Sequence, residues 1–254
     1  MIPYLIWSLL SFLAKGNYTF ERLLKIGLTP DAYYWFLWVL FWIFVLFWIV
    51  RRLAHQRKVN ELVLLWMATG ILIVMMIGLN TRYFGFRFIA YYFFFYTLGY
   101  CLHKVPRLQI KNKITIVMMT LMWIVLAWGW SMHGLPTYMP TNNVVPRSLV
   151  LYAYRGITAI VAIEVIFYVA PKLLDKIKNM NLTMIKAGRL SLGIYTIHIL
   201  LLDVAKPLCW RLMQEIGYMG ALIIVFILVC FISLAVVDFI NKNKKTAQLL
   251  LGKV

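Results

Sequence analysis

Charge is scarce in this chain, and negative charge is scarcest. Only 13% of its 254 residues are charged, and Asp and Glu together number 8. A soluble domain has about 25% charged residues and roughly 45–50% apolar ones, whereas hydrophobic residues here reach 63%. One water-surrounded core cannot bury this excess, so lipid must solvate much of the surface. The composition indicates an integral membrane protein and excludes a soluble domain.

Cysteine and the common catalytic motifs are also sparse. Cys101, Cys209 and Cys230 lie in or beside apolar segments without C-x-x-C spacing, so neither a disulfide framework nor a zinc site is indicated. The chain has no GxxxxGK[ST] phosphate loop, no HExxH zinc helix and no GxSxG elbow. ATP hydrolysis and zinc proteolysis are unsupported, and we expect no metal and no bound cofactor.

Long apolar runs are what the chain does have, and they predict its fold class. In lipid, only helices or a closed barrel satisfy the backbone hydrogen bonds, and a barrel needs short segments of alternating polarity. The runs are continuous, so we predict an all-α integral membrane protein, one polytopic domain over residues 1–254. A span needs about 20 apolar residues. The predicted bundle has about eight spans: 2–14, 34–50, 62–79, 88–102, 114–132, 148–170, 190–208 and 217–237.

Basic residues alternate between the two sides of these spans. If residue 1 is cytoplasmic, the loops on that side and the tail after residue 241 carry 17 Lys and Arg. The opposite loops, which include 209–216, carry 8 when Lys206 is counted. The positive-inside rule therefore predicts that both termini are cytoplasmic. It also accounts for the formal charge of +18 without a nucleic-acid partner.

Two charged residues stand inside the sixth predicted span. Charges in the bilayer are costly and are usually functional or paired. Arg155 and Glu164 are nine residues apart, a rotation of about 180° on a helix, so they cannot pair with each other. Arg155, near the start of the span, either snorkels to the outer interface or needs a partner. Glu164 is deeper, and we expect it to reach Arg82, Arg87, Tyr195 or a tyrosine from residues 91–100.

The seventh span carries one polar stripe. Ser191, Tyr195 and His198 follow at i, i+4 and i+7, so they share a helix face, which we expect to point into the bundle. His198 lies near mid-bilayer, where a neutral imidazole can act as a base or donate one hydrogen bond. The alternative is a histidine that only packs against a neighbouring helix, and the spacing leaves both interpretations open.

Four segments follow one another along the chain: IPYLIWSLL at 2–10, YYWFLWVLF at 33–41, RFIAYYFFFYTLGYCL at 87–102 and GRLSLGIYTIHILLL at 188–202. In this order they resemble the acyltransferase-3 family of bacterial membrane enzymes. The last is similar to the family's G-x-x-S-x-x-I-Y-x-x-H helix, and matches it through Gly188, Ser191, Ile194, Tyr195 and His198. The third is similar to an aromatic helix ending in F-x-x-G, with Tyr96 in the Phe place before Gly99.

The resemblance implies O-acylation, commonly acetylation, of a sugar in a surface polysaccharide or glycolipid at the inner (plasma) membrane. The implied donor is acyl-CoA, whose phosphates need cations, and a base must remove the sugar hydroxyl proton. We assign catalytic roles to His198 and Glu164. Substrate binding is assigned to five residues: Arg155, Tyr195, Ser191, Arg82 and Arg87. Arg51, Arg52, Arg57 and Lys58 form a basic cluster that can hold phosphates loosely.

The chain departs from the family at its start. Family members resemble ten-span bundles, with a histidine regarded as catalytic on the first span and an Arg-x-x-Arg motif before the Ile-Pro-Tyr segment. This chain starts at Pro3 and Tyr4 of that segment and resembles the last eight spans. We therefore expect little or no transferase activity from it alone.

Two other classes of function remain open. One is a transporter or flippase for a small acid or a lipid-linked sugar, which mid-bilayer polar residues would also suit. That class predicts inverted repeats and spans broken by glycine or proline, and the sequence shows neither. The other is a structural subunit without chemistry.

Overall fold

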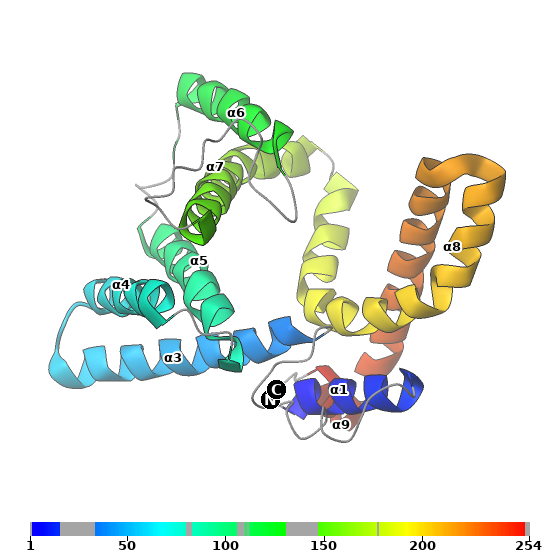
Figure 1. Cartoon of the computed structure of the whole chain (residues 1–254), viewed down its shortest axis with the longest axis horizontal. Helices are drawn as coiled ribbons and strands as arrows, with labels where there is room; N and C mark the ends of the chain where they lie inside the picture. The colour runs from blue at the N-terminus through cyan, green and yellow to red at the C-terminus, as the bar shows by residue number, and fades with distance from the viewer. Residues whose placement is uncertain are drawn as a thin grey trace. The chain divides into compact units, whose positions relative to one another are not determined.

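The described part of the chain is helical throughout. The computed structural model describes residues 2–15, 34–79, 83–105, 110, 112–130, 147–176 and 178–251, and no strand occurs among them. Figure 1 shows the helices. They are α1 (Ile2–Lys15), α3 (Trp35–Arg57), α4 (Glu61–Leu79), the 3₁₀ turn η2 (Tyr83–Gly85), α5 (Phe86–Lys104), α6 (Lys113–Trp128), α7 (Arg147–Lys176), α8 (Lys178–Asn241) and α9 (Lys244–Leu251). The all-α fold class is confirmed.

The predicted spans correspond to these helices. The first six lie on α1 and α3 to α7, and the last two lie on α8; α6 ends four residues before its predicted limit, at Trp128. By length and composition, four helical segments of the described residues can cross a membrane. They are Trp35–Arg57, Glu61–Gly78, Leu149–Leu174 and Leu190–Asn241. The last, at 52 residues, is long enough for two spans. A total of eight spans stays a prediction.

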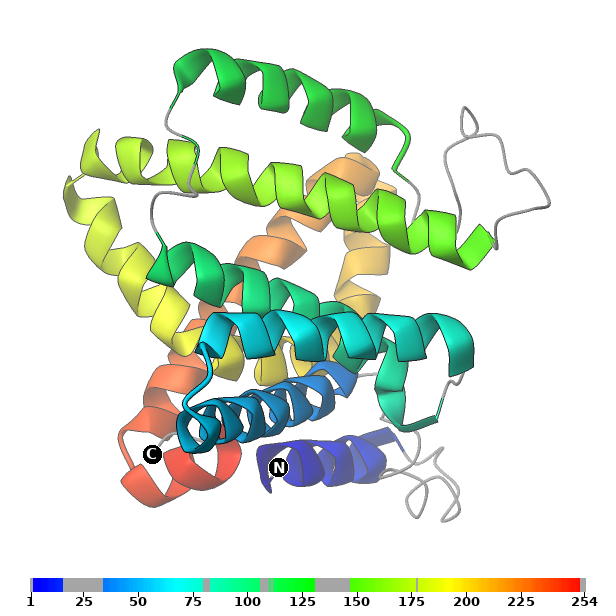
Figure 2. The same ribbon diagram turned by 90° about the vertical axis from the view of Figure 1, so that its left-hand side faces the viewer.

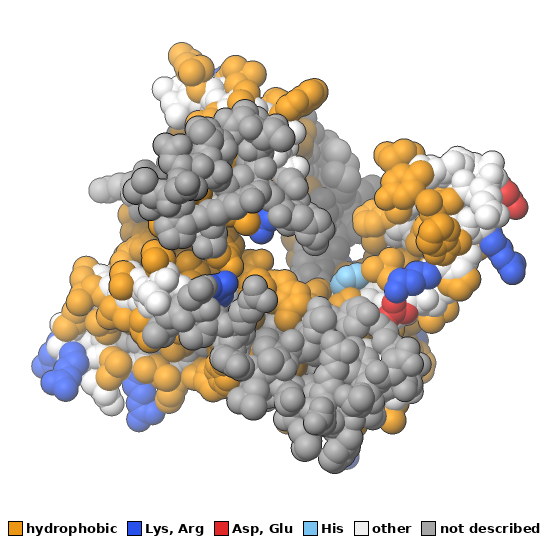
Figure 3. All heavy atoms as spheres, in the orientation of Figure 1, with side chains coloured by type: hydrophobic (Ala, Val, Ile, Leu, Met, Phe, Trp, Pro, Cys, Tyr) orange, Lys and Arg blue, Asp and Glu red, His pale blue; other side chains and the backbone are white. Residues whose placement is uncertain are grey.

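Exposed apolar side chains identify the medium around the helices. On α4, Val63, Met67, Ile71 and Val74 are between 51% and 69% exposed. Their spacings of four, four and three residues place them on one helix face. Hydrophobic side chains cover much of the described surface in Figure 3. Lipid is the solvent in which such a surface is stable, so the chain is a membrane protein.

Packing divides the chain into two compact units. The first unit comprises Met1–Thr97 and Thr183–Val254, and the second comprises Leu98–Leu182. Helix α5 runs from the first unit into the second, and α8 begins in the second and continues in the first. Three of the four segments that resemble the acyltransferase-3 family, 2–10, 33–41 and 188–202, lie entirely in the first unit. The remaining segment, 87–102, begins in the first unit and ends in the second.

The second unit is built on α6 and α7. The two helices lie side by side in Figures 1 and 2. Asn112 caps α6, because its side chain accepts a hydrogen bond from the Ile114 N–H. The buried Tyr154 of α7 donates its hydroxyl to the Leu126 carbonyl of α6. That bond anchors α7 to the last turn of α6.

Helix α8 turns back on itself at Gly217. This residue has φ 76° and ψ 169°, a backbone conformation that is essentially restricted to glycine. The predicted loop over 209–216 is wrong, since these residues continue the helix to the turn. They include neither Gly nor Pro, so nothing in them breaks a helix. The two arms are joined by an ion pair between Lys186 Nζ and Asp238 Oδ2, 2.7 Å apart.

The core of the first unit forms where the two arms of α8 meet α9. A Cβ at Gly193 would lie 2.9 Å from Val237 Cγ1 and 3.1 Å from Leu251 Cδ2, both belonging to buried side chains. Helices that pack in lipid use small residues for such close approaches. Gly193 therefore sets how closely the first arm approaches its neighbours.

The tail beyond residue 241 contains one more helix. Residues 244–251 form α9, which buries Ala247 and Leu251. The Trp7 indole of α1 donates a 2.8 Å hydrogen bond to the Leu250 carbonyl. This bond satisfies one of the carbonyl groups that have no intrahelical partner at the end of α9. It therefore helps to hold α9 against α1.

We predict that Gly193→Ala destabilises the protein by about 1–3 kcal/mol, the usual cost of overpacking a core. The stiff β-branched Val237 cannot easily move aside. Thermal unfolding of the full chain in detergent measures the effect. Gly188→Ala on the same helix is the control, because a Cβ there meets nothing within 4 Å. It should be neutral or stabilising by up to about 1 kcal/mol. Equal melting temperatures for both variants would contradict the close approach.

Candidate active site

Phe36 brings together three of the segments that resemble the acyltransferase-3 family. Its ring lies 5.3 Å from the Tyr195 ring of α8 and 6.3 Å from the Tyr92 ring of α5, edge to face in both cases. Trp35, the next residue back on α3, lies 4.8 Å from Phe88 and 5.6 Å from Tyr92. We call these five residues the aromatic cluster. The cluster belongs to the first unit and joins α3, α5 and α8 around one contact.

The start of α3 is fixed to α8 by Tyr34. This tyrosine is fully buried, and its hydroxyl donates a 3.4 Å hydrogen bond to the Thr196 carbonyl. Thr196 is also buried, and its own hydroxyl donates to the Gly193 carbonyl at 2.7 Å. Buried hydroxyl groups need such partners, and here the partner of Tyr34 lies next to Tyr195. The bond therefore holds Phe36 in register with Tyr195.

His198 lies on α8 beside the aromatic cluster. The ring is half-buried and lies 5.6 Å from the Tyr195 ring. Its Nδ1 is 3.0 Å from the Ile194 carbonyl oxygen. A carbonyl only accepts, so the hydrogen bond assigns a proton to Nδ1. In the neutral imidazole this leaves the Nε2 lone pair as the acceptor, the form that a general base requires.

Ser191 does not share the packed face. Its side chain is exposed and donates a 2.8 Å hydrogen bond to the Gly188 carbonyl of its own helix. The prediction that Ser191 points into the bundle is wrong, because its side chain is exposed although the adjacent Leu190 is buried. Tyr195 and His198 remain as the polar stripe.

The start of α5 carries Arg87, which is half-buried beside Phe88. The turn before it is unusual, since Phe84 has φ 61°, a left-handed conformation that is rare for a bulky residue. Two tryptophans of α3 hold it there: Trp38 Nε1 donates to the Phe84 carbonyl at 3.0 Å, and the Trp42 and Phe84 rings are 4.8 Å apart. Such contacts stabilise a strained residue and set where α5 begins. Arg82, the other arginine predicted to bind substrate, lies outside the described residues.

Arg155 and Glu164 lie in the second unit. The Arg155 guanidinium sits 5.3 Å from the centre of the Trp130 ring, a favourable cation–π geometry. The Tyr154 ring stacks on the same Trp130 ring, with the two ring centroids 6.3 Å apart. Glu164 is half-buried. Its predicted pairing with Arg87 or Tyr195, which belong to the first unit, stays a prediction.

A second feature of the first unit is an open pocket of about 700 Å³ at the α3–α4 connection. It is lined by Phe47, Trp48, Arg51, Arg52, Ala54, His55, Lys58, Val59 and Glu61. Figure 3 shows Lys and Arg side chains gathered at this end of α3. Three of these residues, Arg51, Arg52 and Lys58, belong to the basic cluster predicted from the sequence. It does not show that aromatic side chains share their pocket.

Neither feature includes a metal centre within the described part of the chain. Among the residues whose placement is described, no three or more His, Cys, Asp or Glu side chains come close enough to hold an ion. The arrangement instead offers a basic imidazole nitrogen beside aromatic rings, and a separate cationic pocket. Together they define an all-α membrane protein with groups suited to proton transfer and to anion binding.

The comparison with known families identifies the class. The family model described as an acyltransferase domain, acyltransferase-3, matches residues 1–239. The chain belongs to this family, which confirms the resemblance seen in the four segments. No curated protein and no solved structure is matched by the chain.

We predict that Phe36→Ala destabilises the first unit by about 1–3 kcal/mol, since each aromatic pair that it loses contributes about 0.5–1.5 kcal/mol. Thermal unfolding in detergent measures the loss, with Phe226→Ala as the control because Phe226 is 68% exposed. A double-mutant cycle with Tyr195→Ala should show positive coupling. Strict additivity of the two single changes would contradict the Phe36–Tyr195 contact.

Proposed function

We propose that the protein is a membrane O-acyltransferase that moves an acyl group, foremost acetyl, from acyl-CoA to a sugar hydroxyl of a surface polysaccharide or glycolipid. The family match over residues 1–239 supports the reaction class. The observation that carries the proposal is the hydrogen bond between His198 Nδ1 and the Ile194 carbonyl. It leaves Nε2 as a base on the helix that most resembles the family.

The proposed reaction needs one proton transfer in each direction. His198 Nε2 takes the proton of the sugar hydroxyl, and the hydroxyl oxygen attacks the thioester carbonyl carbon. The carbon–sulfur bond then breaks, and the imidazolium returns the proton to the leaving thiolate of CoA. An imidazole suits both steps because Nε2 can accept a proton in the first step and return it in the second. Acyl-CoA is a substrate here, and no resident cofactor or metal takes part.

The remaining predicted site residues have supporting roles in this proposal. Tyr195 borders the imidazole and offers a hydroxyl to the acceptor sugar, and Arg87, Arg155 and Ser191 are proposed to bind substrate. Glu164 is the second proposed catalytic group, because a carboxylate within a span is costly unless it is used or paired.

The proposal predicts acetyl transfer above background, though weak, by membranes that contain the full chain, and its loss in His198→Ala. Transfer of labelled acetyl from acetyl-CoA to cell-envelope glycan is the measurement. Removing a general base typically lowers the rate 10²–10⁴-fold, with the KM for acetyl-CoA little changed. His103→Ala is the matched control, since His103 is exposed at the end of α5, and it should retain activity. Transfer no greater than that of membranes without the chain, or equal rates in both variants, would refute the proposal.

We propose that the protein lies in the plasma membrane with both termini in the cytoplasm. The support is the 17 to 8 distribution of Lys and Arg between the two sets of loops. In a background without native cysteines, a membrane-impermeant thiol reagent applied to intact cells should label Pro140→Cys but not Lys242→Cys. The reverse pattern would invert the topology.

A further inference from the structure

The pocket at the α3–α4 connection lies where an apolar helix leaves the membrane. Phe47 and Trp48 belong to the predicted span 34–50, and the cations of the pocket follow within the next ten residues. Aromatic residues at this position mark the membrane–water interface. The pocket therefore has an apolar wall on its membrane side and a cationic wall at the depth of lipid headgroups.

The charges of the pocket favour anions. Arg51, Arg52 and Lys58 face one carboxylate, that of Glu61, so the lining has an excess of two positive charges even when His55 is neutral. Guanidinium groups bind phosphate through paired hydrogen bonds. A volume of about 700 Å³ is within the usual range of sites for small organic ligands, roughly 300–1,000 Å³.

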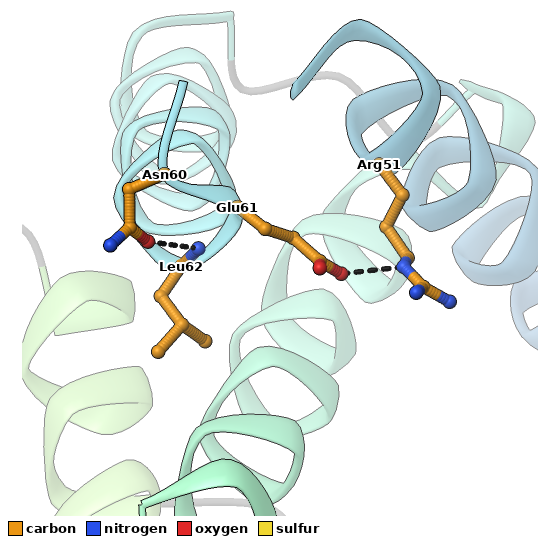
Figure 4. Close-up of polar contacts among 4 residues, drawn as sticks. All are labelled: Arg51, Asn60, Glu61 and Leu62. Atoms are coloured by element: carbon orange, nitrogen blue, oxygen red, sulfur yellow. Dashed lines mark hydrogen bonds and ion pairs between the residues drawn. The ribbon is translucent and has the colours of Figure 1, made fainter. Parts of the chain in front are cut away.

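Two of the cations, Arg51 and Arg52, are oriented by contacts with other residues that line the pocket. Arg51 Nε lies 2.5 Å from Glu61 Oε1, and Figure 4 shows the two side chains pointing toward one another from α3 and α4. The Arg51 guanidinium is 5.6 Å from the Phe47 ring centre. The Arg52 guanidinium is 5.2 Å from that of Trp48. Cations that are already oriented lose less entropy when they bind a ligand.

The connection that carries the pocket is short and well capped. Lys58 ends α3 in the left-handed conformation, φ 53°, which turns the chain within a few residues. Asn60 then caps α4, because its Oδ1 accepts a 2.9 Å hydrogen bond from the Leu62 N–H (Figure 4). The two walls of the pocket are therefore adjoining helix ends, whose positions the caps define.

We propose that this pocket binds a phosphate-bearing ligand at the membrane surface. Basic pockets between membrane helices at this depth suit anionic headgroups, and the aromatic wall suits the apolar part of a lipid. Two sources offer the same chemistry: the phosphodiester of an anionic phospholipid, and the phosphates of CoA. The second source rests on the proposed function, and the first does not.

Binding to the detergent-purified full chain tests the proposal with three probes: a short-chain phosphatidylglycerol, the matching phosphatidylcholine, and CoA without an acyl group. The test variant is Arg52→Gln with Lys58→Asn, because asparagine tolerates the left-handed conformation. The control is Lys104→Gln with Lys113→Gln, which removes the same charge from exposed positions outside the pocket lining and outside the basic cluster. Melting temperatures establish that both variants are folded.

We expect phosphatidylglycerol or CoA to bind more tightly than phosphatidylcholine. The test variant should weaken that binding at least tenfold, since each cation near an anionic headgroup contributes about fivefold. The control should change it less than threefold. Preference for phosphatidylglycerol assigns the lipid as the source, and preference for CoA assigns the donor. No preference over phosphatidylcholine, or equal losses in the test and control variants, would overturn the proposal whatever the outcome of the transfer assay.

Discussion

The contact of Phe36 with Tyr195 and Tyr92 is the interaction on which the candidate active site depends. Lipid tails are as apolar as the side chains of the helices, so the hydrophobic effect gives helices in a bilayer little reason to associate in one arrangement. Specific packing and hydrogen bonds between helices must select it. Phe36 supplies two ring contacts at once, and Tyr34 adds a hydrogen bond to α8 beside them. These contacts place His198 beside helices from distant parts of the sequence.

Small and hydroxylated residues provide specific contacts between helices elsewhere in the first unit. Gly193 permits the close approach of Val237 and Leu251, and the buried hydroxyl groups of Thr69 on α4 and Thr97 on α5 share a 3.2 Å hydrogen bond. Glycine and threonine are the residues expected at helix contacts in lipid. The long apolar side chains that dominate the composition are then left for the lipid-facing surface, as the exposed stripe on α4 shows.

Composition and periodicity were enough to predict the all-α membrane class and the position of a helix at every predicted span, because apolar length and backbone satisfaction leave few alternatives in lipid. They failed at 209–216, because these residues continue the helix as far as the turn at Gly217. The i, i+4, i+7 spacing correctly predicted that Tyr195 and His198 are neighbours. It misplaced Ser191, because spacing alone does not show how much of a helix face is covered by other helices. The sequence alone could not show that cations and aromatic side chains line one pocket at the α3–α4 connection, because this depends on how the chain turns between the two helices.

Helices α3 and α8 meet through Phe36 and Tyr195 within the membrane. Thiol crosslinking in native membranes tests this contact directly, in a chain whose Cys101, Cys209 and Cys230 are replaced by alanine. A short bifunctional thiol reagent should crosslink Phe36→Cys to Tyr195→Cys. It should not crosslink Phe36→Cys to Tyr218→Cys, which lies about six helical turns further along α8. Absence of the first crosslink, or equal yields for the two pairs, would contradict the account.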